Sequence, residues 1–156
     1  MAQDVFHLIL RAQADYARAI DDDRLESWPD YFDDPCLYKI TTAANYREGF
    51  EAGIVFANSR GMLIDRVSSL REANIYERHT YRHILGVPSI LEETTGGVRS
   101  ETPFLVARIM REGETDIFAT GRYLDLYRIR DGSAKLAERI VVCDSSRIDT
   151  LLAIPL

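Results

Sequence analysis

The hydrophobic positions of the chain change their period about halfway along the sequence. Over residues 4–20 the apolar side chains recur every three to four positions, which is the period of an amphipathic helix. Asp4 stands where its carboxylate can cap the first turn of this helix. The run Asp21-Asp22-Asp23 is expected to end it.

A second helical piece is expected directly afterwards. Asp23 and Glu26 have the spacing of a capping box. Pro29 disfavours helical geometry at Trp28, so we expect a break there and a new turn from the proline. The segment 33–35, Asp-Asp-Pro, should end the helical region.

The middle of the chain predicts a strand at residues 36–42, a shorter strand at 54–57 and a helix at 60–73. The first strand has alternating apolar residues on one face, namely Cys36, Tyr38 and Ile40. The positions that mark the buried side of the helix are Met62, Val67 and Leu70, with Leu63 and Ile64 adjoining.

From residue 80 onward the pattern is that of strands. The expected strands are 80–91, 104–111, 115–130 and 134–144. Gly86 and Pro88 should interrupt the first of them, and Asp131-Gly132 is a strong hairpin signal. Four long strands joined by short turns make a meander. One mainly antiparallel sheet covered by N-terminal helices gives an α+β fold, and we expect residues 1–156 to form one domain.

Several of these strands carry charged residues among apolar ones on both faces. In the last strand Arg139 shares a side with Ala137 and Val141, where a sheet with one dry face should alternate more cleanly. We therefore expect a second, partly covered face that carries Arg108, Arg122, Arg128 and Arg139. A protein partner is one explanation for the cover, and a curved sheet that forms its own pocket is the other.

Composition narrows the function classes. The net charge of −6 argues against a nucleic-acid partner, because phosphate binding requires a basic surface. The chain holds 17 Arg but only 2 Lys, a skew that suits a protein interface but that biased base composition in the genome also explains. No apolar run approaches the ~20 residues of a membrane span, and the N-terminus does not resemble a secretory signal. We expect a cytoplasmic protein that does not bind membranes.

Metal and cofactor motifs are not found in the sequence. The histidines are His7, His79 and His83, and the last two belong to an expected strand, where their side chains lie ~13 Å apart. No Cys-x-His pair, glycine-rich phosphate loop or Gly-x-Ser-x-Gly elbow occurs. Cys36 and Cys143 are isolated and are expected in the core. We therefore expect no catalytic, cofactor-binding or metal-binding residue on this chain.

An acid–base pocket inside a cone of sheet and helices is the alternative. Tyr38, His83, Tyr123 and Asp125 could line it as base and oxyanion donors, as in a stand-alone isomerase or dehydratase. The structural interpretation is that the two tyrosines fill the core and that Asp125 pairs with a neighbouring arginine.

The segment 71–83 is the richest in polar and aromatic residues. It is either a solvated connection between helix and strand or a docking surface, because arginine and tyrosine are typical of interface hot spots. The candidate subunit-interface residues are Arg66, Arg71, Arg78, His79, Tyr81 and Arg82.

Several stretches of the chain resemble the small (beta) subunits of Rieske-type aromatic-ring dioxygenases, and the likeness extends over nearly the whole chain. These stretches are Asp65-Arg66-Val67 leading into Leu70-Arg71, then Tyr81-Arg82-His83-Ile84, residues 118–125 and residues 136–140. Residues 69–79 and 149–156 are most similar to family members that act on terephthalate. One departure is Tyr123, because many members carry a second arginine after Gly121-Arg122.

The resemblance implies a cystatin-like or nuclear-transport-factor-2-like cone, with the helices packed on a strongly curved sheet. It implies a structural subunit that trimerises and binds a large (alpha) catalytic subunit in an alpha3beta3 hexamer. The large subunit would hold the Rieske 2Fe-2S cluster and the mononuclear Fe(II). The enzyme would convert terephthalate to a cis-dihydrodiol with O2 and electrons from a transiently bound reductase fed by NAD(P)H.

Overall fold

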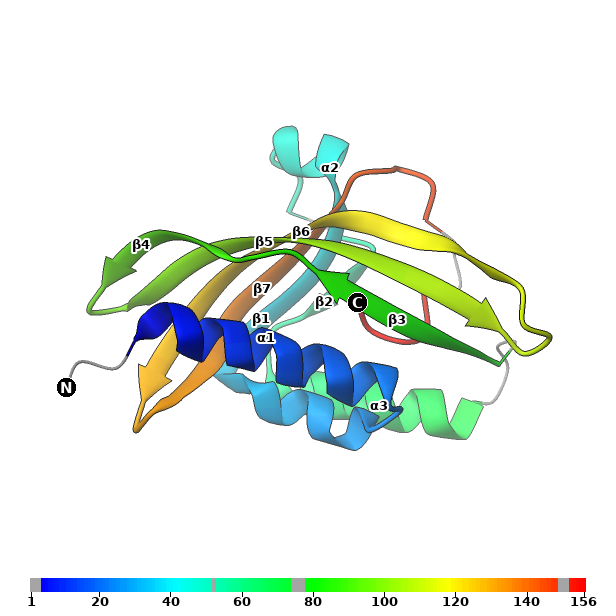
Figure 1. Ribbon diagram of the computed structural model, residues 1–156, viewed down its shortest axis with the longest axis horizontal. Helices are drawn as coiled ribbons and strands as arrows, with labels where there is room; N and C mark the ends of the chain where they lie inside the picture. Colours follow the sequence, from blue (N-terminus) through cyan, green and yellow to red (C-terminus); the bar gives the residue numbers. More distant parts are fainter. Residues whose placement is uncertain (1–3, 52, 74–77, 149–151) are drawn as a thin grey trace.

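The computed structural model describes residues 4–51, 53–73, 78–148 and 152–156. Three α-helices, one 3-10 helix and seven strands are found in these residues (Figure 1). In chain order they are α1 (Val5–Asp21), η1 (Leu25–Tyr31), β1 (Phe32–Thr42), α2 (Ala43–Arg47), β2 (Val55–Ala57), α3 (Arg60–Ala73), β3 (His79–Leu85), β4 (Ser89–Thr94), β5 (Gly97–Met110), β6 (Thr115–Arg130) and β7 (Ser133–Cys143). None of the described helices is long and apolar enough to cross a membrane.

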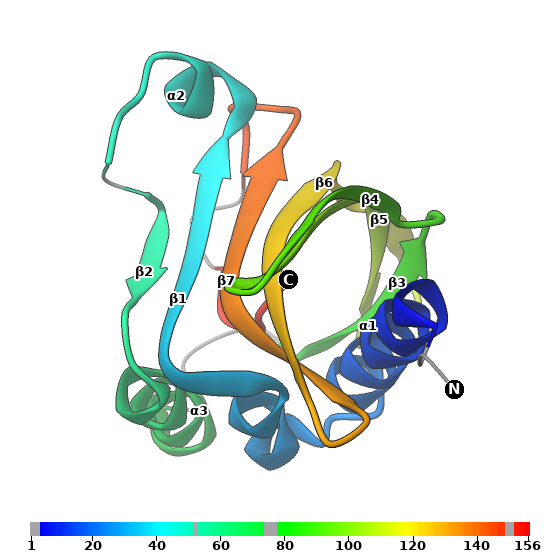
Figure 2. The same ribbon diagram turned by 90° about the vertical axis from the view of Figure 1, so that its left-hand side faces the viewer.

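All seven strands of the described residues belong to one sheet. Its order is β2-β1-β7-β6-β5-β3, and β4 pairs with β5 beyond the end of β3. β1 runs parallel to β7, and the other pairs are antiparallel. The sheet curls strongly, and α1 lies across the open side of the curve next to β3 (Figure 2). The predicted α+β class and curved, mainly antiparallel sheet are confirmed.

Helix α1 forms where the apolar period predicts it. The Asp4 side chain accepts hydrogen bonds from the backbone N–H groups of Phe6 and His7, which would otherwise lack a partner within the helix. Ile9, Tyr16 and other residues at helical spacing are buried against the sheet. The N-terminal cap predicted from the sequence is confirmed.

The second helical piece differs from the prediction. It is a continuous 3-10 helix with Pro29 inside it, so the break expected at Trp28 does not occur. Trp28 is fully buried and packs edge-on against Phe32 and Tyr38, and this packing outweighs the local preference. Asp23 does not cap the helix either, because its carboxylate binds Arg71 from α3.

Strand β1 begins at Phe32, four residues earlier than expected. The Asp-Asp-Pro segment lies inside β1, at a register shift between Phe32 and Leu37. It therefore does not separate helix from strand. Cys36, Tyr38 and Ile40 are all buried, as their alternation predicts. The sequence predicts a meander of antiparallel strands and gives no sign that β1 pairs in parallel with β7.

Helix α3 has the predicted bounds, and its buried residues are Leu63, Val67 and Leu70. Met62 is 38% exposed, so its assignment to the buried side was wrong. The short helix α2, which directly follows β1, was not predicted. Thr42, the residue before the helix, caps it: its hydroxyl accepts a hydrogen bond from the N–H of Asn45.

Glycines account for the interrupted strand and the final hairpin. Gly86 separates β3 from β4, and its N–H donates to the carbonyl oxygen of Pro103 at 2.8 Å. A Cβ atom at Gly86 would lie 2.5 Å from the ring of that proline, so only glycine fits. Asp131 and Gly132 both have positive φ, the conformation of a two-residue hairpin turn. Both features match the prediction.

Candidate functional site

The interior of the curved sheet is built around an arginine. Arg139 on β7 is fully buried, and its guanidinium carbon lies 4.2 Å from the ring centre of Tyr16 and 3.9 Å from that of Tyr123. It therefore points into the cone, so the cover that the sequence predicts over this arginine comes from the curvature of the sheet itself and not from a protein partner. The curvature of the sheet turns Ala137, Arg139 and Val141 inward together, and all three are buried.

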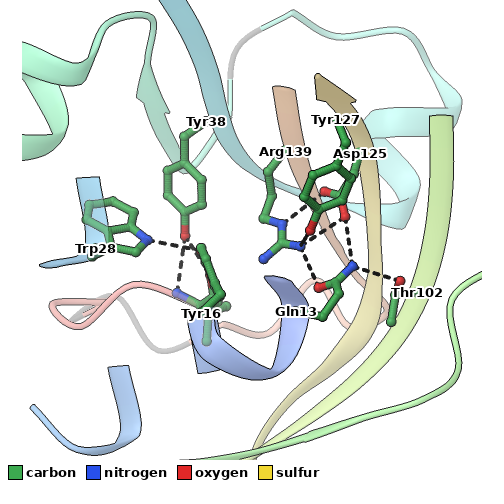
Figure 3. A network of polar contacts seen from close by, with 9 residues as sticks. Gln13, Tyr16, Trp28, Tyr38, Thr102, Asp125, Tyr127 and Arg139 are labelled. Atoms are coloured by element: carbon green, nitrogen blue, oxygen red, sulfur yellow. Dashed lines mark hydrogen bonds and ion pairs between the residues drawn. The ribbon is translucent and has the colours of Figure 1, made fainter. Parts of the chain in front are cut away.

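Arg139 holds a network of polar side chains (Figure 3). Its Nε and Nη2 donate to the two carboxylate oxygens of Asp125, each at 2.9 Å. Nη2 also donates to the Oε1 of Gln13 at 2.7 Å and to the hydroxyl of Tyr127 at 3.2 Å. Gln13 in turn donates to Thr102 and to Asp125. A two-point guanidinium–carboxylate pair of this kind is strong and directional.

A second polar cluster lies beside the first (Figure 3). The hydroxyls of Tyr16 and Tyr38 donate to the carbonyl oxygen of Leu156, at 2.8 and 3.0 Å. The Leu156 N–H donates to Tyr38, and the Trp28 indole N–H donates to Tyr16. Burial raises the pKa of Tyr16 and raises that of Tyr38 well above its usual value, so neither hydroxyl ionises near neutral pH.

The structure buries all four candidates for an acid–base pocket but gives each its own packing. Tyr38 binds Leu156, and Asp125 binds Arg139. Tyr123 stacks on Phe104, and burial raises its pKa well above the usual value. His83 faces Asp21, with 2.7 Å between its Nδ1 and a carboxylate oxygen. These positions match the structural interpretation of the tyrosines and of Asp125.

Two buried polar atoms of this group remain without a hydrogen-bond partner among the described residues. They are the Nε2 of His83 and the hydroxyl of Tyr123. The His83 ring is nevertheless fixed, because Asp21 accepts from its backbone N–H at 2.9 Å as well as contacting Nδ1. This double contact joins the end of α1 to the middle of β3.

The candidate interface residues on β3 lie on opposite sides of the sheet, because side chains alternate along the strand. Arg82 is exposed on the outer side of the sheet, whereas Tyr81 and the buried His83 point to the inner side. Arg78 is exposed directly before the strand. Arg71 on α3 binds both Asp23 and Glu26, and Arg66 on the same helix is half-buried. Residues 74–77, in the middle of the predicted docking segment, lie outside the described residues.

Four of the six candidate interface residues line a pocket of about 610 Å³. Arg71, Arg78, His79 and Tyr81 line it together with side chains from α1, β5 and the C-terminal segment. The sequence singled out these four, but it gave no sign that Arg111 and Asp21 would join them. Residues this far apart in the chain meet only through the pairing of β3 with β5 and the packing of α1 on β3.

The other arginines predicted on a partly covered face have partners of opposite charge or aromatic partners. Arg122 pairs with Glu101, and Arg128 pairs with Asp33. Arg108 lies 3.5 Å from Asp116 and over the ring of Phe118.

Within the described ranges no three His, Cys, Asp or Glu side chains are grouped as metal ligands would be. Both cysteines are buried and unbridged. Burial raises the pKa of Cys36 to about 11 and that of Cys143 to about 12, which opposes the thiolate form that binds metals.

The fold defines a class of small α+β domains with helices on a strongly curved sheet. Within that class the chain belongs to the ring hydroxylating beta subunit family, whose model matches residues 15–150. It is thus a small subunit of an aromatic-ring dioxygenase, an oxidoreductase, and a large alpha subunit is its partner. The predicted family resemblance is confirmed, and a stand-alone isomerase or dehydratase is not favoured.

Relatives and solved structures agree with this family. Beta subunits 1 and 2 of the terminal oxygenase component of terephthalate 1,2-dioxygenase from Comamonas sp are each 54% identical to the chain over 143 residues, covering 92% of it and 93% of each relative. The crystal structure of an aromatic-ring-hydroxylating dioxygenase beta subunit from Novosphingobium aromaticivorans matches with a TM-score of 0.89 and 37% identity, over 97% of this chain and 96% of that chain. The beta subunit of a benzoate 1,2-dioxygenase from Burkholderia mallei shares the fold, with a TM-score of 0.79 and 12% identity over 99% of this chain and all of the other.

Proposed function

We propose that this chain is the structural small subunit of an oxygenase that dihydroxylates terephthalate to a cis-dihydrodiol. The choice of terephthalate as the substrate rests on one observation, the 54% identity to two terephthalate dioxygenase beta subunits over nearly the full length of each chain. The large subunit binds the substrate and uses O2 and electrons that a reductase takes from NAD(P)H. The small subunit works in the cytoplasm as one domain of 156 residues.

The Rieske 2Fe-2S cluster and the mononuclear Fe(II) belong to the large subunit in this proposal. The family assignment supports this placement. A Rieske cluster requires two cysteines and two histidines around one pair of irons. Here Cys36 and Cys143 are buried in the core, and His83 is held by Asp21.

The proposed assembly is an alpha3beta3 hexamer in which three copies of this chain associate. The support is an apolar patch on the outer side of the sheet, which we call the outer patch, formed by Arg82, Ile84, Leu105 and Ile117. Cross-strand pairing brings these residues together, because Ala107 of β5 pairs with both Arg82 and Ile117, and Leu105 pairs with Ile84. Ile84 is 59% exposed and Ile117 is 66% exposed, which is unusual for a cluster of large apolar side chains. Of the six candidate interface residues named above, Arg82 belongs to this patch and is the one that we propose for the interface.

The activity is tested on the complex reconstituted from this chain, its large subunit and a reductase. With NAD(P)H and O2 the complex should convert terephthalate to a cis-dihydrodiol. Variants His83→Phe, Tyr123→Phe and Asp125→Asn should keep the rate per intact, iron-loaded complex within a few-fold, whereas loss of a catalytic acid or base costs ~10²–10⁴-fold. A hundredfold loss in an intact complex would overturn the structural role. Oxidation of a different aromatic acid instead of terephthalate would overturn only the substrate.

The assembly is tested by Arg82→Ala, with Arg47→Ala as the control. Both arginines are exposed, but Arg47 lies on α2, away from the outer patch. Arg82→Ala should lower the fraction of hexamer in analytical ultracentrifugation while the unfolding temperature of the isolated chain stays constant. Equal behaviour of the two variants would remove Arg82 from the interface.

A further inference from the structure

The pocket beside the cone has the size of a ligand site. Its lining residues include the ends of α1 and α3, the beginning of β3 and the end of β5. Figure 1 shows that these four ends lie on the same side of the molecule. Its volume of about 610 Å³ falls within the roughly 300–1,000 Å³ of small-molecule sites. Tyr81 lines it from the inner side of β3, opposite to Arg82, so the pocket and the outer patch are separate surfaces.

Much of the pocket wall is apolar. Its aliphatic and thioether side chains come from four different parts of the chain, and the ring of Tyr81 adds an aromatic surface. They are Ile20, Leu70, Ile109, Met110 and Ile154. A wall of this kind favours an occupant with an apolar body, because such a body leaves water on binding. A bare inorganic anion would gain nothing from it.

The acidic residues of the pocket are already paired. Asp21 accepts from the backbone N–H of His83 and contacts its ring nitrogen. Asp23 accepts from Arg71 at 2.9 and 3.1 Å, and Arg71 also binds Glu26. The carboxylates of Asp21 and Asp23 therefore already have hydrogen-bond donors within the protein.

Two other arginines of the pocket, unlike Arg71, have no acidic partner among the described residues. Arg78 and Arg111 are exposed, and neither makes a hydrogen bond or ion pair with another residue that the structure describes. They enter the pocket from the two neighbouring strand ends, Arg78 before β3 and Arg111 after β5. Guanidinium groups bind carboxylates through two parallel hydrogen bonds, which gives them both affinity and orientation.

We propose that this pocket binds a small organic acid, with its carboxylate on Arg78 and Arg111 and its apolar body against the wall of Ile20, Leu70 and Met110. The concave, ligand-sized shape favours a small molecule over an acidic side chain of a protein partner, which a flat charged surface would serve. Nothing in the family assignment or in the proposed oxygenase activity requires this site. It would allow the small subunit to sense or retain an aromatic or aliphatic acid independently of the large subunit.

The test is a titration of the purified full-length chain with benzoate, terephthalate and benzamide. Benzamide has nearly the shape of benzoate but no charge, so the comparison isolates the carboxylate. By calorimetry we expect benzoate and terephthalate to bind in the millimolar range or better and benzamide to bind roughly tenfold more weakly. Equal affinity for benzoate and benzamide would overturn the proposal.

The place of binding is read from the methionine methyl groups. The chain has three methionines, of which Met110 lines the pocket and Met62 is exposed on α3. After ¹³C-methyl labelling, benzoate should shift the Met110 signal and leave that of Met62 in place. Met110→Leu assigns the signal by removing it. A benzoate titration that never shifts Met110 would overturn the proposal.

The role of the arginines is tested with Arg78→Gln and Arg111→Gln, and Arg47→Gln is the matched exposed control. Each pocket variant should bind benzoate roughly tenfold more weakly and leave benzamide unaffected. The control should bind both as the natural chain does. If the pocket variants bind benzoate normally but fail to associate with the large subunit, the pocket is a docking site for that subunit and the small-acid proposal is wrong.

Discussion

Asp125 and Arg139 face each other at paired positions of β6 and β7, and both side chains are completely shielded from solvent. Their ion pair stands at the centre of the cone, between the aromatic rings of Tyr16 and Tyr123. Removing either charge would leave the other buried without compensation, so the two residues depend on each other for their place in the core.

Asp125→Asn should therefore destabilise the fold by roughly 3–5 kcal/mol, because it leaves the Arg139 guanidinium buried without its counter-charge. Urea unfolding of the purified chain measures this loss. Glu138→Gln is the matched control, since Glu138 forms an exposed pair with Arg99 on the outer side of the sheet. That substitution should cost less than about 1 kcal/mol. Similar costs for the two variants would show that the interior pair is not a stability determinant.

Asp21→Ala should release the end of α1 from β3. It leaves two buried donors of His83, the backbone N–H and the ring Nδ1–H, without their acceptor. Each stranded donor costs roughly 1–3 kcal/mol. We expect a lower unfolding temperature and faster amide exchange at His83. Asp15→Ala, at an exposed position of the same helix, should change neither, and comparable exchange in the two variants would contradict the role of Asp21.

Gly121→Ala should damage the sheet. A Cβ atom at Gly121 would lie 2.0 Å from the carbonyl oxygen of Val142 on β7, so one strand must shift. Forced repacking of this kind costs roughly 1–3 kcal/mol. Gly61→Ala on α3 is the control, because a Cβ there meets only Ser59 at 3.7 Å. The unfolding temperature should fall clearly for Gly121→Ala and should not fall for Gly61→Ala.

The two buried thiols should make the fold less stable in alkaline solution. Burial raises the pKa of Cys36 to about 11 and that of Cys143 to about 12, whereas an unfolded thiol has a pKa of about 8.5. Above the unfolded value the folded chain holds more protons than the unfolded chain, so stability falls as the pH rises from about 8.5 to about 12. Below that window the contribution is fully present.

Urea unfolding at pH 8 and pH 10 measures this fall. The double variant Cys36→Ala, Cys143→Ala should show a smaller fall, and what remains belongs to the buried tyrosines, whose pKa values are also raised. In the natural chain at pH 8 a thiol reagent should label both cysteines only after unfolding. Rapid labelling of the folded chain would contradict the buried, protonated state.

Local patterns account for the elements that the sequence predicted well. Helix α1 has its own cap at Asp4 and a continuous apolar stripe. The β6–β7 hairpin has Asp131-Gly132, and the gap between β3 and β4 has Gly86. In each case the determining residues are neighbours in the chain, so the physical cause is visible without the fold. The family resemblance, carried by stretches over most of the chain, was likewise present in the sequence and is confirmed.

Elements that depend on distant contacts were predicted less well. The 3-10 helix continues through Pro29 because Trp28 packs against Phe32 and Tyr38. Strand β1 starts at Phe32 because that residue pairs with Leu136, which is more than 100 residues away in the chain. No local propensity can report such a pairing, because its free energy comes from burial and hydrogen bonds that exist only in the folded sheet.

The sequence by itself determined the α+β order of elements, the family and the side of each strand on which a residue lies. Alternation correctly grouped Arg139 with Ala137 and Val141, but it could not show which side of the strand faces the helices. Only the tertiary structure decided that this side is the inside of a closed curve, where a charged residue survives because Asp125 neutralises it and Tyr16 and Tyr123 cover it. It also brought Arg78 and Arg111 to one pocket, since the antiparallel pairing of β3 and β5 joins the beginning of one strand to the end of the other.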